Sequence, residues 1–353
     1  MSLATCTAAD AFGGRDPLHD TVIDVRSPAE FAEDHLPGAV NWPVLDDAER
    51  AEVGTLYTQV STFDARKRGA ALVSRNIARL LEEHVADRPR DWRPLVYCWR
   101  GGQRSGSLSI VLAQIGFRTH QLQGGYKAFR GLVRDALADL PAQMQWQVLG
   151  GRTGTGKTLL LQALAAQGAQ VLDLEDLAAH RGSVLGGLPD RPQPSQKHFE
   201  TQLWQALRHL DPARPVFVER ESRRIGRLQL PESLLPALHG SPHQWRVDMP
   251  LPARVALLQR EYAFLMTDLP ALDQRLAALT ALRGRATIER WQALARAGDW
   301  ATLLGELMVQ HYDPLYDRAA HDGEAPARPL PLADGSPDAL QAAARALIAA
   351  TAT

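Results

Sequence analysis

The chain has 353 residues, 45% of them apolar and 22% charged, with 39 basic residues against 40 acidic ones. This length suits about two globular domains, and the composition excludes a disordered, collagen-like or coiled-coil protein. The net charge of −1 excludes a uniformly basic surface, so a nucleic-acid partner would require a local basic patch.

The first half of the chain alternates β-branched runs with stretches of helical periodicity. Strands are predicted at 21–25, 40–42 and 94–97, and helices at 28–33, 75–85 and 105–115. Such alternation predicts a parallel sheet with helices on both faces. Asp139-Leu140-Pro141 is predicted to separate a first domain, residues 1–140, from a second, residues 141–353.

The second half begins another α/β unit and then becomes helical and rich in arginine. Strands are predicted at 146–149, 170–174 and 215–218, and helices at 157–167, 254–265 and 283–297. Residues 326–331 are predicted to be a linker, and Ser336-Pro337-Asp338 to begin a last helix. The predicted class is therefore α/β in both domains, with a helical C-terminal part.

The chain has only two cysteines, Cys6 and Cys98. Two cysteines cannot build a disulfide framework, so we expect a protein of the reducing cytoplasm. The N-terminal residues do not resemble a signal peptide, and no apolar run reaches the roughly 18 to 20 residues that span a bilayer. We therefore expect neither export nor a membrane partner. Cys6 is expected to lie in a frayed terminus and to have no role.

Cys98 lies between a predicted strand and a predicted helix, followed by Trp99, Arg100, Gly101, Gly102, Gln103 and Arg104. A thiol there faces backbone N–H groups and the positive end of the helix, which favour the thiolate and also bind an anion. We predict a nucleophile acting on an anionic sulfur, selenium, phosphorus or arsenic species. The alternative, a buried structural cysteine, would not require two glycines and two arginines in the six positions that follow.

Several ordered motifs resemble the rhodanese family across roughly residues 10–135. They are Val22–Phe31, His35–Asn41, the Cys98 loop and the Gly116–Gly125 segment. The resemblance implies that Cys98 carries a persulfide or, by analogy, a perselenide. The loop has the form C-x5-R, one residue longer than in typical sulfur-transferring rhodaneses, which suggests a larger, phosphate-like ligand. Asp24 and Arg26 are expected to form a structural pair that supports this loop.

A second motif, G-x4-G-K-T, predicts a phosphate-binding loop between a strand and a helix. It comprises Gly151, Arg152, Thr153, Gly154, Thr155, Gly156, Lys157 and Thr158. Backbone N–H groups would surround phosphate oxygens, the lysine would supply a positive charge, and the Thr158 hydroxyl is suited to Mg²⁺. Any di- or triphosphate satisfies this loop, including the diphosphate of a prenyl donor.

An ATPase also requires an acidic residue at the end of a second strand. Glu219 is the best candidate, and Asp173 or Glu175 is the alternative. Arg220, Arg223 and Arg224 follow Glu219 closely and are predicted to contact RNA or substrate phosphate. Lys197 is predicted to close over the phosphate loop. Residues 254–296 carry seven arginines and four acidic residues, which fits either an RNA-binding surface or ion-paired helix faces.

The combination of these motifs resembles the tRNA 2-selenouridine synthase family over essentially the whole chain. The motifs are Cys98–Ser105, Tyr126–Arg130, Gly150–Thr158 and Glu219–Gly226. The resemblance implies a tRNA with 2-thiouridine at the wobble position as substrate, selenophosphate as selenium donor, and a first step in which geranyl diphosphate alkylates the thiocarbonyl sulfur. It implies no tightly bound cofactor, leaves Mg²⁺ open, and suggests a selenophosphate-producing enzyme as a partner.

Two other functions remain compatible with the residues. One is an ATP-dependent kinase or tRNA sulfurtransferase that uses a Cys98 persulfide. The other is not an enzyme: a regulatory rhodanese joined to a nucleotide-sensing module, in which Cys98 would be unreactive toward alkylating agents at neutral pH.

Overall fold

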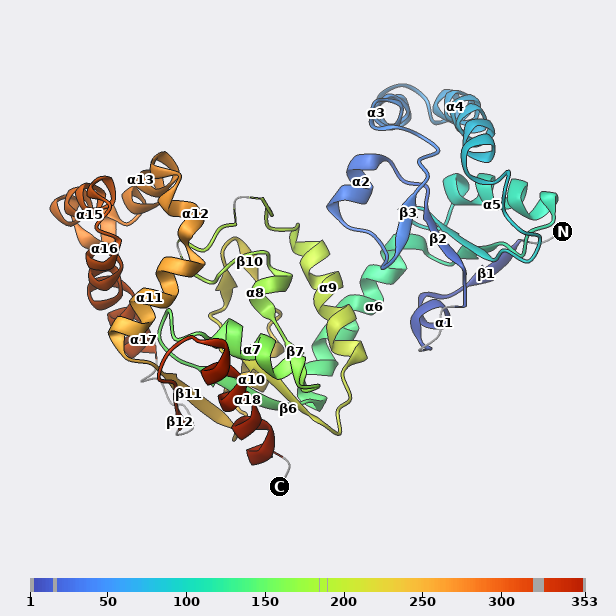
Figure 1. Ribbon diagram of the computed structural model, residues 1–353. Helices are drawn as coiled ribbons and strands as arrows, with labels where there is room; N and C mark the ends of the chain where they lie inside the picture. Colours follow the sequence, from blue (N-terminus) through green and yellow to red (C-terminus); the bar gives the residue numbers. More distant parts are fainter. Residues whose placement is uncertain (1–2, 15–17, 184, 189, 320–326, 352–353) are drawn as a thin grey trace. The chain divides into compact units, whose positions relative to one another are not determined.

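The structure, a computed structural model, describes residues 3–14, 18–183, 185–188, 190–319 and 327–351 (Figure 1). The chain divides into two compact units. The first comprises Met1–Leu137 with Ser195–Gln205, and the second comprises Ala138–Pro194 with Ala206–Thr353. Part of a helix that follows the phosphate loop in sequence therefore packs with the first unit.

The first unit is built on a parallel sheet of five strands in the order β1-β5-β4-β2-β3. The strands are β1 (Ala4–Cys6), β2 (Thr21–Asp24), β3 (Ala39–Asn41), β4 (Pro94–Tyr97) and β5 (His120–Leu122). The helices are α1 (Ala8–Phe12), α2 (Pro28–Glu33), α3 (Asp47–Thr55), α4 (Thr62–His84), α5 (Gln103–Ile115) and α6 (Gly125–Asp139), with η1 (Leu56–Val60) between α3 and α4.

The core of this unit joins the sheet to α4 and α5. Ile23 and Val96 come from the strands, Leu72 and Ile77 from α4, and Leu108 from α5. All five side chains are at most 6% exposed. Every residue of β4 is buried, as expected for a central parallel strand covered on both faces. The carboxyl end of β4 is consequently a rigid base for the loop that follows it.

The second unit contains another parallel sheet of five strands, in the order β12-β11-β6-β8-β7. The strands are β6 (Gln145–Gly150), β7 (Gln170–Leu172), β8 (Pro215–Glu219), β11 (Gln244–Asp248) and β12 (Arg328–Pro331). A small antiparallel hairpin, β9 (Arg224–Ile225) and β10 (Leu228–Gln229), follows β8. The helices near the sheet are α7 (Lys157–Ala166), α8 (Leu174–Leu177), α10 (Leu234–His239) and α18 (Pro337–Thr351). Helix α9 (Gln196–His209) belongs to the first unit as far as Gln205.

The described residues between β11 and β12 form a helical subdomain. It contains α11 (Leu251–Glu261), α12 (Ala263–Met266), α13 (Leu269–Ala277), α14 (Thr280–Arg283), α15 (Arg285–Ala297), α16 (Trp300–Leu307), η3 (Met308–Tyr312) and α17 (Asp313–Ala319). These helices have a core of their own around the fully buried Trp291. The sheet and helices α7 and α18 share a separate core.

The predicted α/β class is confirmed, and several local expectations are corrected. Residues 328–331, predicted as linker, form edge strand β12 on β11; Pro326 lies outside the described residues. Proline lacks a backbone N–H, and it is tolerated on an edge strand because only one side of such a strand pairs with a neighbouring strand. Cys6, predicted in a frayed terminus, is 8% exposed in β1, which pairs with β5. Residue 174, predicted as the end of a strand, begins α8 because Asp173 caps that helix.

Candidate active sites

The Cys98 loop joins β4 to α5 and holds its thiol almost completely buried, at 4% exposure. The Ser105 hydroxyl, on the first turn of α5, donates to the Cys98 Sγ over 3.2 Å. Gly101 has a φ of 66°, and a Cβ there would lie 2.5 Å from the carbonyl oxygen of Leu122. A Cβ on Gly125, which has a φ of 57°, would overlap the Cys98 carbonyl oxygen. These glycines allow the two loops to pack closely.

The electrostatic surroundings of Cys98 favour the thiolate. Burial raises the pKa of the thiol. Hydrogen bonds from the Ser105 side chain and backbone, the charge of Arg104 and the Gly102 backbone lower this pKa by more than burial raises it, so the net pKa lies below its usual value. This is the state required of a nucleophilic cysteine. The sequence prediction of an activated thiol therefore agrees with the geometry.

The other predicted loop residues lie in different positions. Trp99, Arg100, Gly102 and Gln103 are exposed, whereas Arg104 forms an ion pair with Glu30 at 2.8 Å. The side-chain amide of Gln121 donates to the carbonyl oxygens of Gly101 and Gly102 and to the Ser105 hydroxyl. Gln121 is a positioning residue that the sequence analysis did not identify. Its hydrogen bonds hold the Gly101 and Gly102 carbonyl oxygens of the loop in place.

A buried ionic network supports this loop from below. Arg26 and Asp24 are at most 1% exposed and pair at 2.6 Å, which confirms the predicted structural pair. The Arg26 guanidinium lies 4.0 Å from the centroid of the Tyr126 ring, and the Tyr126 backbone N–H donates to the Cys98 carbonyl oxygen. The pair therefore acts on the loop through Tyr126.

Lys197 lies in the first unit, where its ammonium forms an ion pair with Glu33 at 2.7 Å. Its neighbours in α9, His198 and Thr201, contact the buried Asp34. In this structure Lys197 is part of the packing of α9 on the first unit.

The phosphate loop joins β6 to α7, as the motif predicts. Gly151, Gly154 and Gly156 all have positive φ, and a Cβ on Gly151 would lie 2.6 Å from the Val247 carbonyl oxygen. The Lys157 Nζ donates to the Gly151 carbonyl oxygen over 3.0 Å. The loop opens into a cavity of about 610 Å³, which Lys157 and Thr158 help to line.

Two loop residues serve structural purposes. Thr155 is 2% exposed, and its hydroxyl donates to the Arg152 carbonyl oxygen. The Arg152 guanidinium pairs with Asp317 at 2.8 Å, and neither Arg152 nor Thr155 is among the described residues lining the cavity. The Thr153 carbonyl oxygen accepts two hydrogen bonds from Arg254, which fixes the loop to α11.

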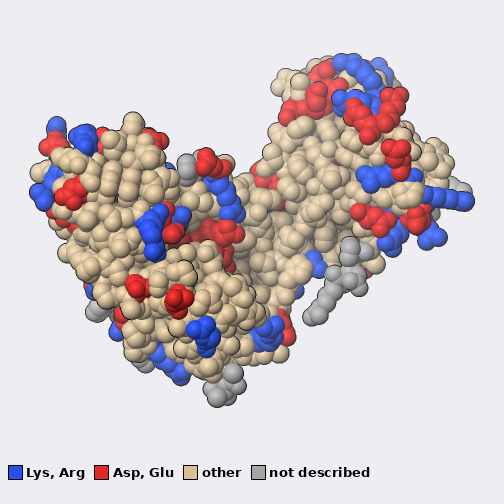
Figure 2. All heavy atoms as spheres, in the orientation of Figure 1, with Lys and Arg blue, Asp and Glu red and all other residues tan. Residues whose placement is uncertain are grey.

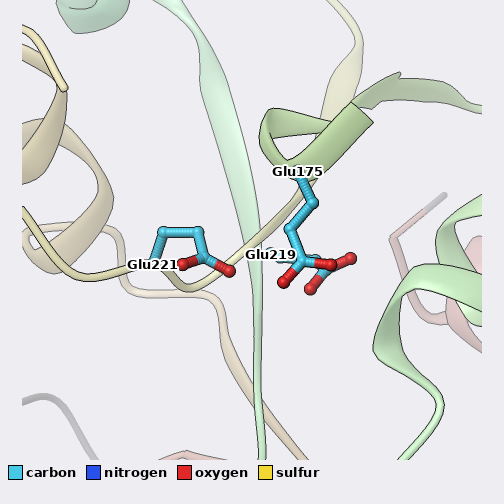
Figure 3. Close-up of side chains that lie close together, drawn as sticks. All are labelled: Glu175, Glu219 and Glu221. Carbon is cyan, nitrogen blue, oxygen red and sulfur yellow. The ribbon is translucent and has the colours of Figure 1, made fainter. Parts of the chain in front are cut away.

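Three carboxylates meet opposite the phosphate loop (Figure 3). One oxygen from each of Glu175, Glu219 and Glu221 lies within 4.8 Å of the others, and the carboxyl groups point toward one another. Glu175 comes from α8, Glu219 ends β8 and Glu221 lies two residues further on. The Thr158 hydroxyl donates to Glu175 over 3.2 Å.

Crowding and burial disfavour the charged forms of these carboxylates. Burial and the neighbouring Glu219 raise the pKa of Glu175 to about 9 and that of Glu221 to about 7. Burial also raises the pKa of Glu219, whereas the charge of Lys157 lowers it. Glu219 is 1% exposed, and its Oε1 has no hydrogen-bond partner among the described residues. An oxygen-rich set with an unpartnered buried acceptor fits a hard divalent cation such as Mg²⁺.

The sequence analysis identified Glu219 and named Glu175 as an alternative, but it did not identify Glu221. Residues two apart in an extended segment share one side, which is the signal that would have selected Glu221 with Glu219. Asp173 lines the cavity, but its Oδ1 accepts from the Asp176 backbone N–H as the cap of α8. Burial raises the pKa of Asp173.

The predicted arginines fall into two groups. Arg220 is half-buried after β8, where its backbone N–H donates to the Leu149 carbonyl oxygen. Arg223 and Arg224 are exposed at the β9–β10 hairpin, and Arg223 pairs with the exposed Glu232 at 3.4 Å. These two side chains are accessible to an RNA backbone.

The arginines of residues 254–296 are engaged within the protein. The Arg254, Arg290 and Arg296 guanidinium groups pair with Asp313, Glu306 and Asp273, and Arg285 pairs with Glu289. Arg260, Arg275 and Arg283 donate to Gly335, Leu185 and His311. Figure 2 shows basic and acidic atoms interspersed over α13 and α15. This pattern favours ion-paired helix faces over an RNA-binding surface.

Both halves of the chain match known domains. A model of the rhodanese-like domain matches residues 8–132, and a model of the tRNA 2-selenouridine synthase AAA domain matches residues 144–275. The class of the protein is therefore a rhodanese-like domain joined to a P-loop domain. No helix among the described residues is long and apolar enough to span a membrane.

Named relatives identify the family. A tRNA 2-selenouridine synthase of Marinobacter nauticus is 34% identical over 329 residues, covering 84% of this chain and 87% of that one. The chain belongs to the tRNA 2-selenouridine synthase family. The relative of that name from Nitrosomonas europaea is 39% identical, with 68% of this chain and 63% of the relative covered. The match thus spans less than two thirds of the latter protein.

Among solved structures, an N-terminal domain from Clostridium difficile 630, titled an ATP/GTP binding protein, is 32% identical. The alignment covers 37% of this chain and 98% of that one, with a TM-score of 0.32.

Proposed function

We propose that this protein replaces the sulfur of 2-thiouridine at the tRNA wobble position with selenium, in two steps that its two domains divide between them. The P-loop domain transfers a geranyl group from geranyl diphosphate to the thiocarbonyl sulfur. The rhodanese-like domain then delivers selenium from selenophosphate to the activated base. The observation that carries this proposal is the presence, in one chain of this family, of a thiolate-stabilising loop and a phosphate loop.

In the first step, the sulfur attacks the carbon that bears the diphosphate. The carbon–oxygen bond breaks, diphosphate leaves with the electron pair, and the base releases its N3 proton. Lys157 and the N–H groups at the start of α7 stabilise the charge that develops on the leaving group. The hydrogen bond between Lys157 and the Gly151 carbonyl oxygen is exchanged for a contact with diphosphate.

Glu175, Glu219 and Glu221 fit a divalent cation next to the diphosphate, with the Thr158 hydroxyl on the same side. When bound, Mg²⁺ supplies neutralisation of phosphate charge. The carboxylates themselves hold that cation. Burial and the nearby Glu219 charge raise the pKa of Glu175 and of Glu221, and a bound cation would oppose both effects.

In the second step, the selenium of selenophosphate attacks C2 of the base and the C–S bond breaks, so that geranylthiol leaves after taking up a proton. The Cys98 thiolate then attacks the phosphorus, the Se–P bond breaks with its electron pair on selenium to give 2-selenouridine, and water hydrolyses the phosphocysteine to phosphate. The backbone N–H groups of the C-x5-R loop and the exposed Arg100 bind the phosphate-like head of the donor. Ser105 maintains the thiolate. Selenium stays at the selenide level throughout, so the step consumes no oxidant or reductant, and a thiol reductant serves only to keep Cys98 reduced.

The tRNA is expected to contact Arg223 and Arg224, because both guanidinium groups are exposed after the strand that carries Glu219. Arginine binds phosphate in a bidentate manner, which suits an RNA backbone. The helical arginines contribute little, since their charges are already paired.

A second candidate, an ATP-dependent sulfurtransferase or kinase-like enzyme, is favoured by one observation. Glu219 ends the strand beside β6, and Thr158 lies in the first turn of α7, which is where a Mg²⁺–ATP site places its ligands. Turnover of ATP in the presence of tRNA would select this alternative.

The proposed function is tested by incubating the purified full chain with tRNA that carries 2-thiouridine, geranyl diphosphate, selenophosphate, Mg²⁺ and dithiothreitol. Nucleoside mass analysis is expected to show geranylated 2-thiouridine with geranyl diphosphate alone and 2-selenouridine with both donors. Selenouridine formed at the full rate without geranyl diphosphate, or no modified nucleoside at all, would contradict the proposal.

A further inference from the structure

An apolar slot opens beside the phosphate loop, inside the helical subdomain. Five described residues line both the slot and the phosphate cavity, namely Thr153, Ser183, Leu258, Tyr262 and Tyr312. Thr153 belongs to the phosphate loop itself. Leu258 packs directly against that loop, since a Cβ on Gly154 would lie 2.9 Å from its Cδ1. The slot is therefore continuous with the place where a diphosphate would bind.

Beyond these shared residues, the walls of the slot are entirely apolar. They include Leu265, Leu272, Trp300, Leu303 and Leu307. No Asp, Glu, Lys, Arg or His is among the described residues that line it. A nucleoside base or ribose placed there would leave its polar groups without hydrogen-bond partners, which strongly disfavours its binding. The slot thus excludes a nucleoside and accepts a hydrocarbon.

The slot is also narrow, with a cavity volume of about 40 Å³ next to about 610 Å³ for the phosphate cavity. Leu265, Leu272, Leu303 and Leu307 are each at most 4% exposed and belong to the closely packed core of the subdomain. A longer chain would have to displace these side chains, because close-packed interiors accommodate extra methylene groups poorly. Chain length is therefore restricted by the slot.

We propose that the slot binds the far end of the hydrocarbon tail of the prenyl diphosphate whose head lies on the phosphate loop, with the rest of the tail in the phosphate cavity, and that Leu272 and Trp300 help to set the length of tail accepted. This inference rests on the proposed prenyl transfer and assigns its specificity to residues of α13 and α16. Each methylene group buried in the slot strengthens binding because its apolar surface is removed from water.

Two leucines of α13 provide a matched test. Leu272 and Leu276 are 4% and 0% exposed in the same core, but only Leu272 lines the slot. Prenyl transfer to thiouridine-containing tRNA is measured with donors of five, ten and fifteen carbons. Leu272→Ala is expected to raise use of the fifteen-carbon donor relative to the ten-carbon donor about tenfold. Leu276→Ala should leave this ratio unchanged.

A second variant narrows the slot without removing core volume. Leu304 is half-buried on its wall, and Leu304→Trp is expected to shift preference from the ten-carbon to the five-carbon donor. Calorimetric binding of inorganic diphosphate should be the same in Leu304→Trp and the unmodified protein. Binding of geranyl diphosphate should weaken about tenfold in the variant.

The outcomes separate this inference from the proposed function. If the unmodified protein transfers the geranyl group but neither variant, each confirmed as folded, changes the preference among donors, the tail binds elsewhere and only the inference fails. If the unmodified protein transfers none of the three prenyl groups and binds geranyl diphosphate no better than inorganic diphosphate, the proposed function fails and the inference with it.

Discussion

The Cys98 loop and the phosphate loop share one construction and differ in what they surround. Each follows a buried parallel strand and leads through glycines into a helix, β4 to α5 in one domain and β6 to α7 in the other. The helix N-terminus is positive in both cases. In the first loop this field acts on a thiol, whose net pKa is lowered. In the second it faces carboxylates whose pKa values are raised.

The two sites differ in whether groups of the protein itself balance the charge of the reactive side chains. The Cys98 thiol receives a hydrogen bond from Ser105 and has its charge stabilised by the protein itself. The three glutamates repel one another, and Lys157 donates to its own loop rather than to an anion. The charge on Cys98 is therefore stabilised by groups of the protein itself, whereas the three carboxylates are arranged in a way that fits a cation.

Removing one carboxylate should affect the second site most. Glu219→Gln is expected to lower geranyl transfer on the order of 100-fold, because the buried side chain no longer holds a cation next to the diphosphate. Glu289→Gln, on the exposed face of α15, is a control that should retain activity. Transfer is measured as a function of Mg²⁺ concentration, and an unchanged profile in Glu219→Gln would show that the cluster does not bind the metal.

The same cluster predicts that the stability of the second domain depends on pH when a chelator removes divalent cations. The pKa of Glu175 is near 4.5 in the unfolded chain and about 9 in the folded protein. Such a group contributes stability that is fully present at pH values below the unfolded pKa and is lost as the pH rises through the folded pKa. The unfolding free energy should therefore fall between about pH 5 and pH 9, by an amount on the order of a few kcal/mol. Mg²⁺ should reduce the loss.

Glu219→Gln offers a second readout of this effect. Because the Glu219 charge contributes to the raised pKa of both Glu175 and Glu221, the variant should show a flatter dependence of stability on pH. Thermal unfolding at several pH values measures this. An equally steep decline in the variant would place the titrating groups elsewhere.

At the first site, Ser105→Ala should raise the pKa of the Cys98 thiol, since the hydroxyl that favours the thiolate is lost. Alkylation of Cys98 by iodoacetamide at pH 7 is expected to slow roughly tenfold. Ser107→Ala, with its hydroxyl bonded to the Gln103 carbonyl oxygen on the exposed side of α5, is the matched control. Equal alkylation rates in the two variants would remove Ser105 from the account.

The smallest effect is expected on the surface. The double variant Arg223→Ala/Arg224→Ala should weaken tRNA binding several-fold and make the logarithmic salt dependence about 2 units less steep. Arg285→Ala, whose charge is paired with Glu289, should change neither quantity. An unchanged salt slope in the double variant would exclude the β9–β10 hairpin from the RNA interface.

The features of both domains that depend on neighbouring residues in the chain could be predicted from the sequence. Strand β4 agrees with its expected bounds because a short apolar run between turn residues has few alternatives. Both loops are found where their motifs place them, since glycine and lysine spacing encodes local backbone geometry. These features depend on neighbours in the chain.

Features that depend on distant parts of the chain could not be predicted. The edge strands β1 and β12 exist because a partner strand accepts them, and β12 contains two prolines that argue against a strand. The pairing of Lys197 with Glu33 requires α9 to pack on the first unit. The carboxylate triad likewise joins Glu175 and Glu221 from separate segments.

In the proposed mechanism each domain performs one half of the reaction, so geranyl transfer and selenium transfer should each survive the loss of the other domain's site. Cys98→Ala protein is given thiouridine-containing tRNA and geranyl diphosphate, and the geranylated tRNA is then purified. Lys157→Ala protein receives this tRNA with selenophosphate and thiol reductant, and 2-selenouridine is measured by nucleoside mass analysis. The account predicts geranylation by the first variant and selenation by the second, each near the unmodified rate. Loss of geranylation in Cys98→Ala, or of selenation in Lys157→Ala, would contradict it.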